Sequence, residues 1–229
     1  MQLDNHMSDG EEKVSVGSAR EPSTPKPQAS GRSSPAGTVD ADEVATASTV
    51  LVLEPSDRVA DERTCYSFFA GDRLEEKNVL LVSLNSPADD CIDEFIEHDL
   101  PFPRNLGVIS TEDQLQSTRT ETVKSEAGHS VTVQTVSDPV DLPKLGMSIS
   151  NVLNEWSDDE EVLVCFRSLT VLLQYVELQC VYRFVHVLTD RLASLDAQIH
   201  LHMDGEIHDE QTYATLRPLF DAVVEVIRL

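Results

Sequence analysis

The densest group of side chains that could bind a metal ion or take part in a reaction lies near the carboxyl end of the chain. It consists of His200, His202, Asp204, His208 and Asp209. Alternate residues of a strand face the same side, so the first three share one face if this segment is a strand. Histidine with carboxylate suits Zn²⁺ or a similar ion, but residues two apart on a strand are about 7 Å apart, which is wide for one ion. A strand with hydrogen-bonded histidines is the favoured interpretation; a metal site of His200, His202 and Asp204 and a ligand-sensing pocket are the alternatives.

Phosphate-binding motifs are missing from the sequence. The first apolar run, 49–53, continues into EPSDR at 54–58, which has no glycine and no Lys-Ser or Lys-Thr pair. A phosphate-binding loop needs glycines for close approach of the backbone and a lysine for the β and γ oxygens, so this turn is not a P-loop. Gly-x-Gly-x-x-Gly is absent as well, which excludes the usual dinucleotide fingerprint.

Nucleophilic and acid–base catalysis have equally little support. The chain has no Gly-x-Ser-x-Gly elbow. Adjacent acids such as Asp89 and Asp90 fall at expected helix starts or loops, where solvated surface is the simplest interpretation. The cysteines lie far apart without a Cys-x-x-Cys motif, and two of them, Cys165 and Cys180, lie in apolar runs. We therefore expect buried thiols in a reducing compartment and no disulfide framework.

The charge balance is strongly acidic. Among 229 residues, 41 are Asp or Glu and 17 are Lys or Arg, which gives a formal net charge of −24. Such a charge repels phosphate backbones and anionic lipid headgroups, so neither nucleic acid nor a membrane is an expected partner. The composition resembles that of a cytosolic protein from a halophile. The sequence shows neither a signal peptide nor a membrane-spanning apolar run, so we expect a cytoplasmic protein.

The chain divides into a tail and one folded unit. Residues 1–47 are rich in Ser, Pro, Gly, Thr and acids, which predicts a disordered acidic tail. From 48 to 229, short apolar runs alternate with segments of helical period. This pattern is typical of a three-layer α/β fold with a largely parallel sheet and helices on both faces. The expected strands are 49–53, 78–84, 106–110, 130–136, 162–166, 198–203 and 222–229.

Helical periodicity predicts the elements that cover this sheet. Apolar residues from Leu142 to Trp156 form one helical stripe, with Asp141 as the expected N-cap. Two helices are expected within 169–195, and another within 209–220 with Asp209 as its candidate N-cap. The polar, aperiodic segment 112–128 is expected to be a loop. Ligands of such sheets bind beyond the carboxyl ends of the strands, where helix N-termini converge.

Three segments of the folded unit follow one another in a familiar order. They are NVLLVSLNSPADDCIDEF at 78–95, VLVCFRSLTVLLQYV at 162–176 and HDEQTYATLRPLFDAVVEVIRL at 208–229. They resemble parts of the RecA-like domains of the KaiC group of P-loop ATPases. The first resembles the strand and helix that follow the P-loop helix, the second resembles the Walker B strand, and the third resembles the closing helix and strand. The phrases LPKLGMSIS and LLQYVELQ are also similar to those of uncharacterised haloarchaeal proteins labelled transducer-like (HTR-like). The resemblance implies a RecA-like fold.

The groups that carry out phosphoryl transfer in that family are replaced here. The resemblance places the paired catalytic glutamates at Asn85 and Ser86 and the Mg²⁺-binding aspartate at Arg167. Arg167 is expected to pair with an acid such as Asp204, or else to bind an anionic ligand or a carboxylate of a partner. The candidate pocket consists of Glu54, Ser56, Asn85, Ser86, Arg167 and Asp204.

Together these observations indicate a pseudo-ATPase. We expect a non-catalytic RecA/KaiC-like domain without a cofactor, which acts through protein association in haloarchaeal signalling or regulation. Its partner would be a second copy of the chain or another protein. The alternatives are an ATPase with unorthodox phosphate contacts from Arg167 or Arg58, and a metal-dependent sensor. Fold resemblance alone does not choose between them.

Overall fold

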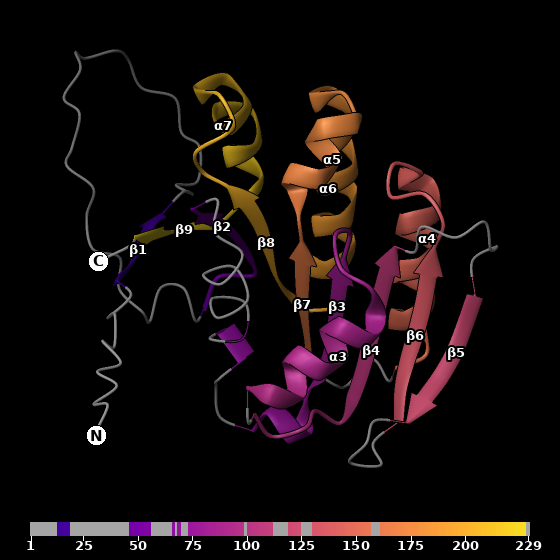
Figure 1. The fold of residues 1–229 in the computed structure, drawn as a ribbon. Coiled ribbons are helices and arrows are strands. Elements are labelled where there is room, and N and C mark those ends of the chain that lie inside the picture. Colours follow the sequence, from indigo (N-terminus) through magenta and orange to yellow (C-terminus); the bar gives the residue numbers. More distant parts are fainter. Residues whose placement is uncertain are drawn as a thin grey trace, which may run out of the picture.

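One sheet runs through the centre of the protein (Figure 1). The computed structural model describes residues 46–55, 66, 68–69, 73–98, 100–111, 131–156 and 161–226, and the backbone of 13–18, 119–124, 130 and 227. The strands within these residues are β1 Lys13–Ser18, β2 Thr49–Glu54, β3 Asn78–Ser83, β4 Asn105–Thr111, β5 Arg119–Lys124, β6 Ser130–Val136, β7 Val162–Arg167, β8 Gln198–Asp204 and β9 Ala222–Ile227. Their spatial order is β1-β9-β2-β8-β7-β3-β4-β6-β5. The seven strands from β9 to β6 are parallel, and β1 and β5 pair antiparallel at the two edges.

The parallel strands are the seven that the apolar runs predict. They are continuous apolar stretches because both faces of the sheet are covered, as β3 illustrates with all six of its residues buried. Side chains that alternate along each strand therefore enter two separate cores. Leu80 and Val82 of β3 pack into the core on one face, and Val79 and Leu81 pack into the core on the other.

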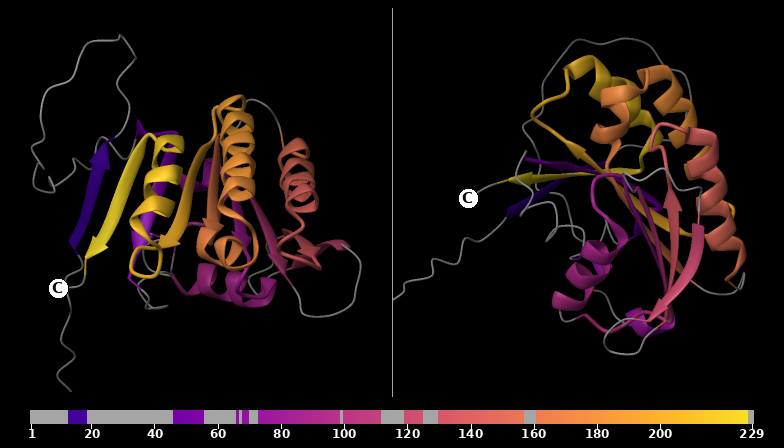
Figure 2. Two further views of the ribbon diagram at one scale, coloured as in Figure 1. Left: turned by 90° about the horizontal axis from the view of Figure 1, so that it is seen from above. Right: turned by 45° about the vertical axis from the view of Figure 1, so that its right-hand side comes forward.

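Helices cover both faces of the sheet, as predicted (Figure 2). One face carries α3 Ala88–Glu97. The other carries α4 Leu142–Asn154, α5 Leu169–Tyr175, α6 Leu178–Ala193 and α7 Glu210–Leu216. Short 3₁₀ helices lie at Leu74–Glu76 and Arg217–Leu219. Among the described residues, no helix combines the length and the apolar character that crossing a membrane requires.

Side chains cap the helices at the residues that the sequence indicates. The Asp141 carboxylate accepts a hydrogen bond from the backbone N–H of Lys144 over 3.1 Å, and the Asp209 carboxylate accepts one from Thr212 over 2.7 Å. Bonds from the side chain and backbone of Thr212 hold the pKa of Asp209 below its usual range. Both predicted N-caps are confirmed. Ser168 caps α5 in the same way, accepting from the N–H of Val171.

The edge strands differ from the sequence predictions. The predicted loop at 112–128 is wrong at Arg119–Lys124, which forms β5 beside β6. Lys13–Ser18, within the predicted tail, forms β1 beside β9, and the rest of that tail up to residue 45 lies outside the described residues. An edge strand pairs on one side only and needs no apolar run, so periodicity does not reveal it.

Candidate functional site

A group of polar side chains is buried on the face of the sheet that α3 covers, near the carboxyl ends of the strands. The sheet register places them together, because Cys165 of β7 is the cross-strand neighbour of His200 of β8. Each is at most 6% exposed to solvent. The members are Glu54, Cys165, Arg167, His200 and His202.

The two histidines point toward one another and toward Cys165. His202 Nδ1 lies 2.7 Å from Glu54 Oε1, and His202 Nε2 lies 3.5 Å from Cys165 Sγ. The two imidazole rings have centroids 5.2 Å apart. One ligand atom from each of Cys165, His200 and His202 falls within 4.8 Å of the other two. Alternate residues of a strand are about 7 Å apart. The candidate ligand atoms lie closer together than this because the side chains incline toward one another.

Aromatic rings cover His200. Phe68 stacks on its imidazole with centroids 4.6 Å apart, and Phe69 lies at 5.1 Å. Burial lowers the pKa of His200 well below its ordinary value, and the neighbouring His202 and Arg167 lower it further. At neutral pH this imidazole is therefore uncharged, the form that binds a metal ion.

Arg167 forms an ion pair with α3. Its Nη2 lies 3.1 Å from Glu94 Oε2, and its guanidinium carbon lies 5.7 Å from the centre of the Tyr66 ring. The Tyr66 hydroxyl donates to the same carboxylate oxygen over 3.4 Å. Burial is the main cause of the raised pKa of Tyr66, so this hydroxyl keeps its proton. Within the described part of the chain, the ion pair of Arg167 is formed with Glu94 and not with the expected Asp204.

Asp204 has a local structural contact. Its Oδ1 accepts hydrogen bonds from the backbone N–H groups of Glu206 over 2.8 Å and Ile207 over 3.3 Å. These bonds stabilise the turn that follows β8. In the structure the third ligand atom beside His200 and His202 comes from Cys165.

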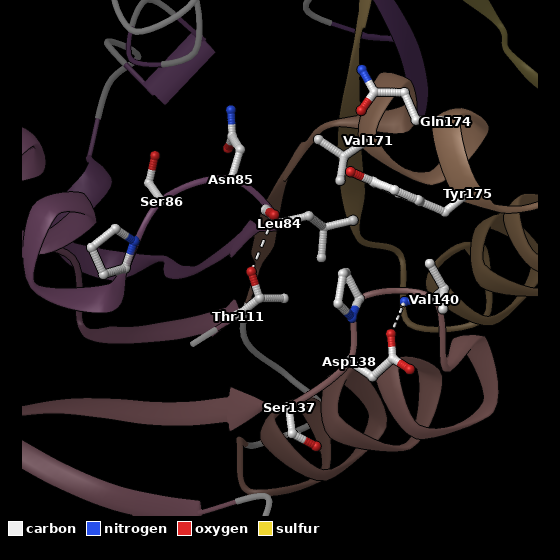
Figure 3. A pocket seen from close by; sticks show the side chains of 12 residues that line it. Leu84, Asn85, Ser86, Thr111, Ser137, Asp138, Val140, Val171, Gln174 and Tyr175 are labelled. Atoms are coloured by element: carbon white, nitrogen blue, oxygen red, sulfur yellow. Dashed lines mark hydrogen bonds between the residues drawn. The ribbon is translucent and has the colours of Figure 1, made fainter. Parts of the chain in front are cut away.

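A second polar region is a cavity of about 1170 Å³ at the carboxyl ends of β3, β4 and β6 (Figure 3). Thr111 Oγ1 donates to the Leu84 carbonyl oxygen over 3.1 Å, and Asp138 Oδ1 accepts from the Val140 N–H over 3.0 Å. Its described wall offers hydroxyl, amide and carboxylate groups but neither lysine nor arginine, so it suits a neutral polar ligand better than a polyphosphate. The lining residues are Leu84, Asn85, Ser86, Pro87, Thr111, Ser137, Asp138, Pro139, Val140, Val171, Gln174 and Tyr175.

The six residues of the predicted pocket thus lie in different surroundings. Glu54 and Arg167 belong to the buried group, and Asn85 and Ser86 line the cavity. Asp204 is the last residue of β8 and its carboxylate bonds to the turn that follows, and Ser56 lies outside the described residues. Sequence reasoning missed Cys165 and Glu94, because only the strand register and the docking of α3 bring them to the histidines and to Arg167.

The cysteine predictions need two corrections. Cys165 is buried but disulfide-bonded, so the expectation of a free thiol at this position is wrong. Cys91 and Cys180 carry free thiols, and the second sulfur of that bond lies outside the described residues. Cys91 is buried, which raises the pKa of its thiol. Cys180 is exposed, not buried, because it lies on the outward side of the first turn of α6.

An apolar groove of about 680 Å³ lies between α4 and α6. Two large apolar side chains stand open to solvent along it, Met147 at 60% exposure and Val187 at 68%. Arg183 and Arg191 provide positive charge on its wall. The lining residues are Leu142, Pro143, Gly146, Met147, Ser150, Asn151, Cys180, Arg183, Phe184, Val187, Leu188 and Arg191.

Comparison with known proteins places the folded unit in a family. None of the curated proteins compared with the chain matches it. A family model matches residues 47–226, which include the parallel strands, both polar regions and the groove. The chain therefore belongs to DUF7504, a family of unknown function.

Proposed function

We propose that the chain is a non-catalytic RecA/KaiC-like domain that acts through protein association in cytoplasmic signalling or regulation of a haloarchaeon. The observation that carries this proposal is the groove between α4 and α6, where Met147 and Val187 face solvent. Exposed apolar side chains that gather along a hollow are typical of an interaction site, whereas single ones scattered over a surface are not. The groove would be covered by a partner.

The partner that we propose is a second copy of this chain. Arg183 and Arg191 line the groove. The exposed Asp190 lies two helical turns after Arg183 and directly before Arg191 in α6, so this side of the helix carries both signs of charge. In a twofold dimer the same surface meets itself, so a patch with both signs is complementary to its own copy. Arg191 is held in place by a 3.0 Å hydrogen bond from its Nη2 to Asn154 Oδ1.

The contacts of the buried group support the absence of ATPase activity. The resemblance expects a Mg²⁺-binding carboxylate at the end of β7, where this chain has a buried arginine paired with Glu94. Glu54, at the end of β2, is occupied by its contact with His202. Phosphoryl transfer depends on groups that hold phosphate and magnesium, and these two side chains are engaged with the protein itself.

Light scattering of the full chain in molar KCl tests the proposal. We expect the mass of a dimer for the wild type and of a monomer for Val187→Asp, because a carboxylate in the groove would be desolvated in the dimer. Ile207→Asp is the matched control, since Ile207 is exposed but does not line the groove. A wild-type mass equal to that of the monomer, or a dimer that Val187→Asp leaves intact, contradicts the proposal.

A nucleotide-binding ATPase with unorthodox phosphate contacts is the second candidate. The cavity at the carboxyl ends of β3, β4 and β6 favours it, because ligands of open α/β sheets bind there. Its described wall has no cationic side chain for a triphosphate. Calorimetric titration of ATP with Mg²⁺ in molar KCl separates the two candidates. We expect no saturable heat, and tight binding with phosphate release would establish the second candidate.

A further inference from the structure

We infer that Cys165, His200 and His202 form a zinc site in the reduced protein. The site goes beyond the proposed association, because it lies on the opposite face of the sheet from the groove. All three residues are buried, and their candidate ligand atoms lie within 4.8 Å of one another. One thiolate and two imidazoles are ligands that Zn²⁺ prefers.

The separation of the donor atoms fits tetrahedral coordination. With Zn–S and Zn–N bonds of about 2.3 and 2.05 Å at a tetrahedral angle, the sulfur and nitrogen ligands lie about 3.5 Å apart. The Cys165 Sγ to His202 Nε2 distance is 3.5 Å. His200 comes from the same strand as His202, and its imidazole approaches that of His202 edge to face with centroids 5.2 Å apart. Small side-chain rotations within the site would bring all three donors onto one ion.

The carboxylate of Glu54 orients His202 for zinc binding. Its carboxylate lies 2.7 Å from Nδ1, so the proton resides on Nδ1 and the lone pair on Nε2 points to Cys165. Histidines that bind zinc commonly donate their other N–H to a carboxylate, which fixes the tautomer and strengthens the ligand.

The oxidation state of Cys165 controls whether the site can form. In the structure its sulfur belongs to a disulfide, and a thiolate is the form that binds zinc. Two electrons and two protons from a dithiol reductant convert the disulfide to two thiols, and the reductant becomes a disulfide. The Cys165 thiol then releases one proton as its sulfur bonds to Zn²⁺. Zinc binding would thus be coupled to reduction.

Titration with Co²⁺ and Zn²⁺ in molar KCl tests the site. In protein reduced with a phosphine, we expect one Co²⁺ per chain, with the intense visible bands of a tetrahedral thiolate complex, displaced by one equivalent of Zn²⁺. The oxidised protein should show no such bands. Cys165→Ser should abolish them, and Cys180→Ser should retain them because Cys180 is an exposed free thiol outside the site. Absence of the bands in the reduced wild type, or their persistence in Cys165→Ser, overturns the inference.

A milder substitution keeps the test decisive if Cys165→Ser does not fold. Glu54→Gln preserves a hydrogen-bond acceptor for His202 but removes the charge. We expect it to weaken Zn²⁺ binding about 10- to 100-fold, measured by competition with a chromophoric chelator. Circular dichroism verifies that the variant is folded. An unchanged affinity in folded Glu54→Gln would refute the role of the carboxylate and with it the proposed geometry.

Discussion

Arg167 illustrates at the residue scale how a charge is tolerated inside this fold. Arg167 is 4% exposed, and its guanidinium lies 3.1 Å from the Glu94 carboxylate. A buried ion pair adds little net stability, because desolvation offsets the attraction, but removal of one partner leaves an uncompensated charge. The contact therefore ties α3 to the end of β7.

Glu94→Ala is expected to lower the free energy of unfolding by about 3 kcal/mol. The value lies at the lower end for a buried pair because the Glu94 side chain retains 20% exposure. Urea unfolding in molar KCl measures the change. Glu97→Ala, on the exposed side of the same helix, should change stability by less than about 0.5 kcal/mol. Equal effects of the two substitutions would show that Arg167 does not rely on Glu94.

His200 makes stability depend on pH. Its pKa is lowered in the folded protein by burial, His202 and Arg167, whereas in the unfolded chain it is about 6.5. Below that pH the unfolded state binds a proton that the folded state does not. The contribution of His200 to the free energy of unfolding is therefore constant above about pH 6.5 and is lost as the pH falls. The loss is about 1.4 kcal/mol per pH unit until the folded form is protonated.

His200→Phe isolates this effect from the titration of carboxylates. The substitution keeps an aromatic ring beside Phe68 and Phe69 and removes the titrating group. Urea unfolding between pH 7 and pH 5 should therefore show a shallower loss of stability for the variant than for the wild type. Parallel pH profiles would mean that His200 is protonated in the folded protein as readily as in the unfolded chain.

The sequence predicted only part of the buried group. Strand alternation correctly places His200 and His202 on one side of β8, because that periodicity is local. Cys165 and Glu94 escaped prediction because their positions depend on the pairing of β7 with β8 and on the docking of α3. Asp204 was assigned to the same face, but its carboxylate bonds to the backbone of the following turn. Strand alternation predicts the face of the sheet on which a side chain lies, but not the direction in which its terminal group points.

At the scale of elements, β4 and α4 pack closely through a glycine. A Cβ atom added to Gly107 of β4 would lie 2.8 Å from Val152 Cγ1 and 3.2 Å from Leu80 Cδ1. Both neighbours are buried in the core and have little room to move. A side chain at this position would push α4 away from the sheet.

Gly107→Ala is expected to destabilise the protein by about 1 to 3 kcal/mol through overpacking. Gly146→Ala is the matched substitution, because there the added Cβ meets only Phe184 Cε2, at an ordinary 3.7 Å. Within the helix interior of α4, alanine should stabilise by about 1 kcal/mol relative to glycine. Thermal unfolding should therefore shift in opposite directions for the two variants. A shift in the same direction would contradict the packing of β4 against α4.

The elements themselves were largely predictable. Seven parallel strands follow from apolar runs, and the N-caps of α4 and α7 follow from Asp141 and Asp209. The edge strands were missed because half of their backbone groups have no strand neighbour and their side chains need not be apolar. Arg119–Lys124, with the sequence RTETVK, is such a polar edge. Burial leaves a compositional signal, and pairing at an edge does not.

On the scale of the whole molecule, the net charge of −24 opposes compaction. Salt weakens this repulsion, since the Debye length falls from about 10 Å at 0.1 M to about 3 Å at 1 M. We expect the melting temperature to rise between about 0.1 and 3 M KCl, because screening lowers the repulsion more in the compact state than in the expanded chain. A melting temperature indifferent to KCl over this range would contradict the prediction.

Removal of charge should reproduce part of the effect of salt. Asp93 and Glu97 are exposed on α3, and the double variant Asp93→Asn, Glu97→Gln lowers the negative charge by two without touching the core. It should melt at a higher temperature than the wild type at 0.1 M KCl and at nearly the same temperature at 3 M, where screening already suppresses the repulsion. A gain of equal size at both salt concentrations would indicate a local effect on the helix. The difference between the two gains thus measures the part of the charge repulsion that salt screens.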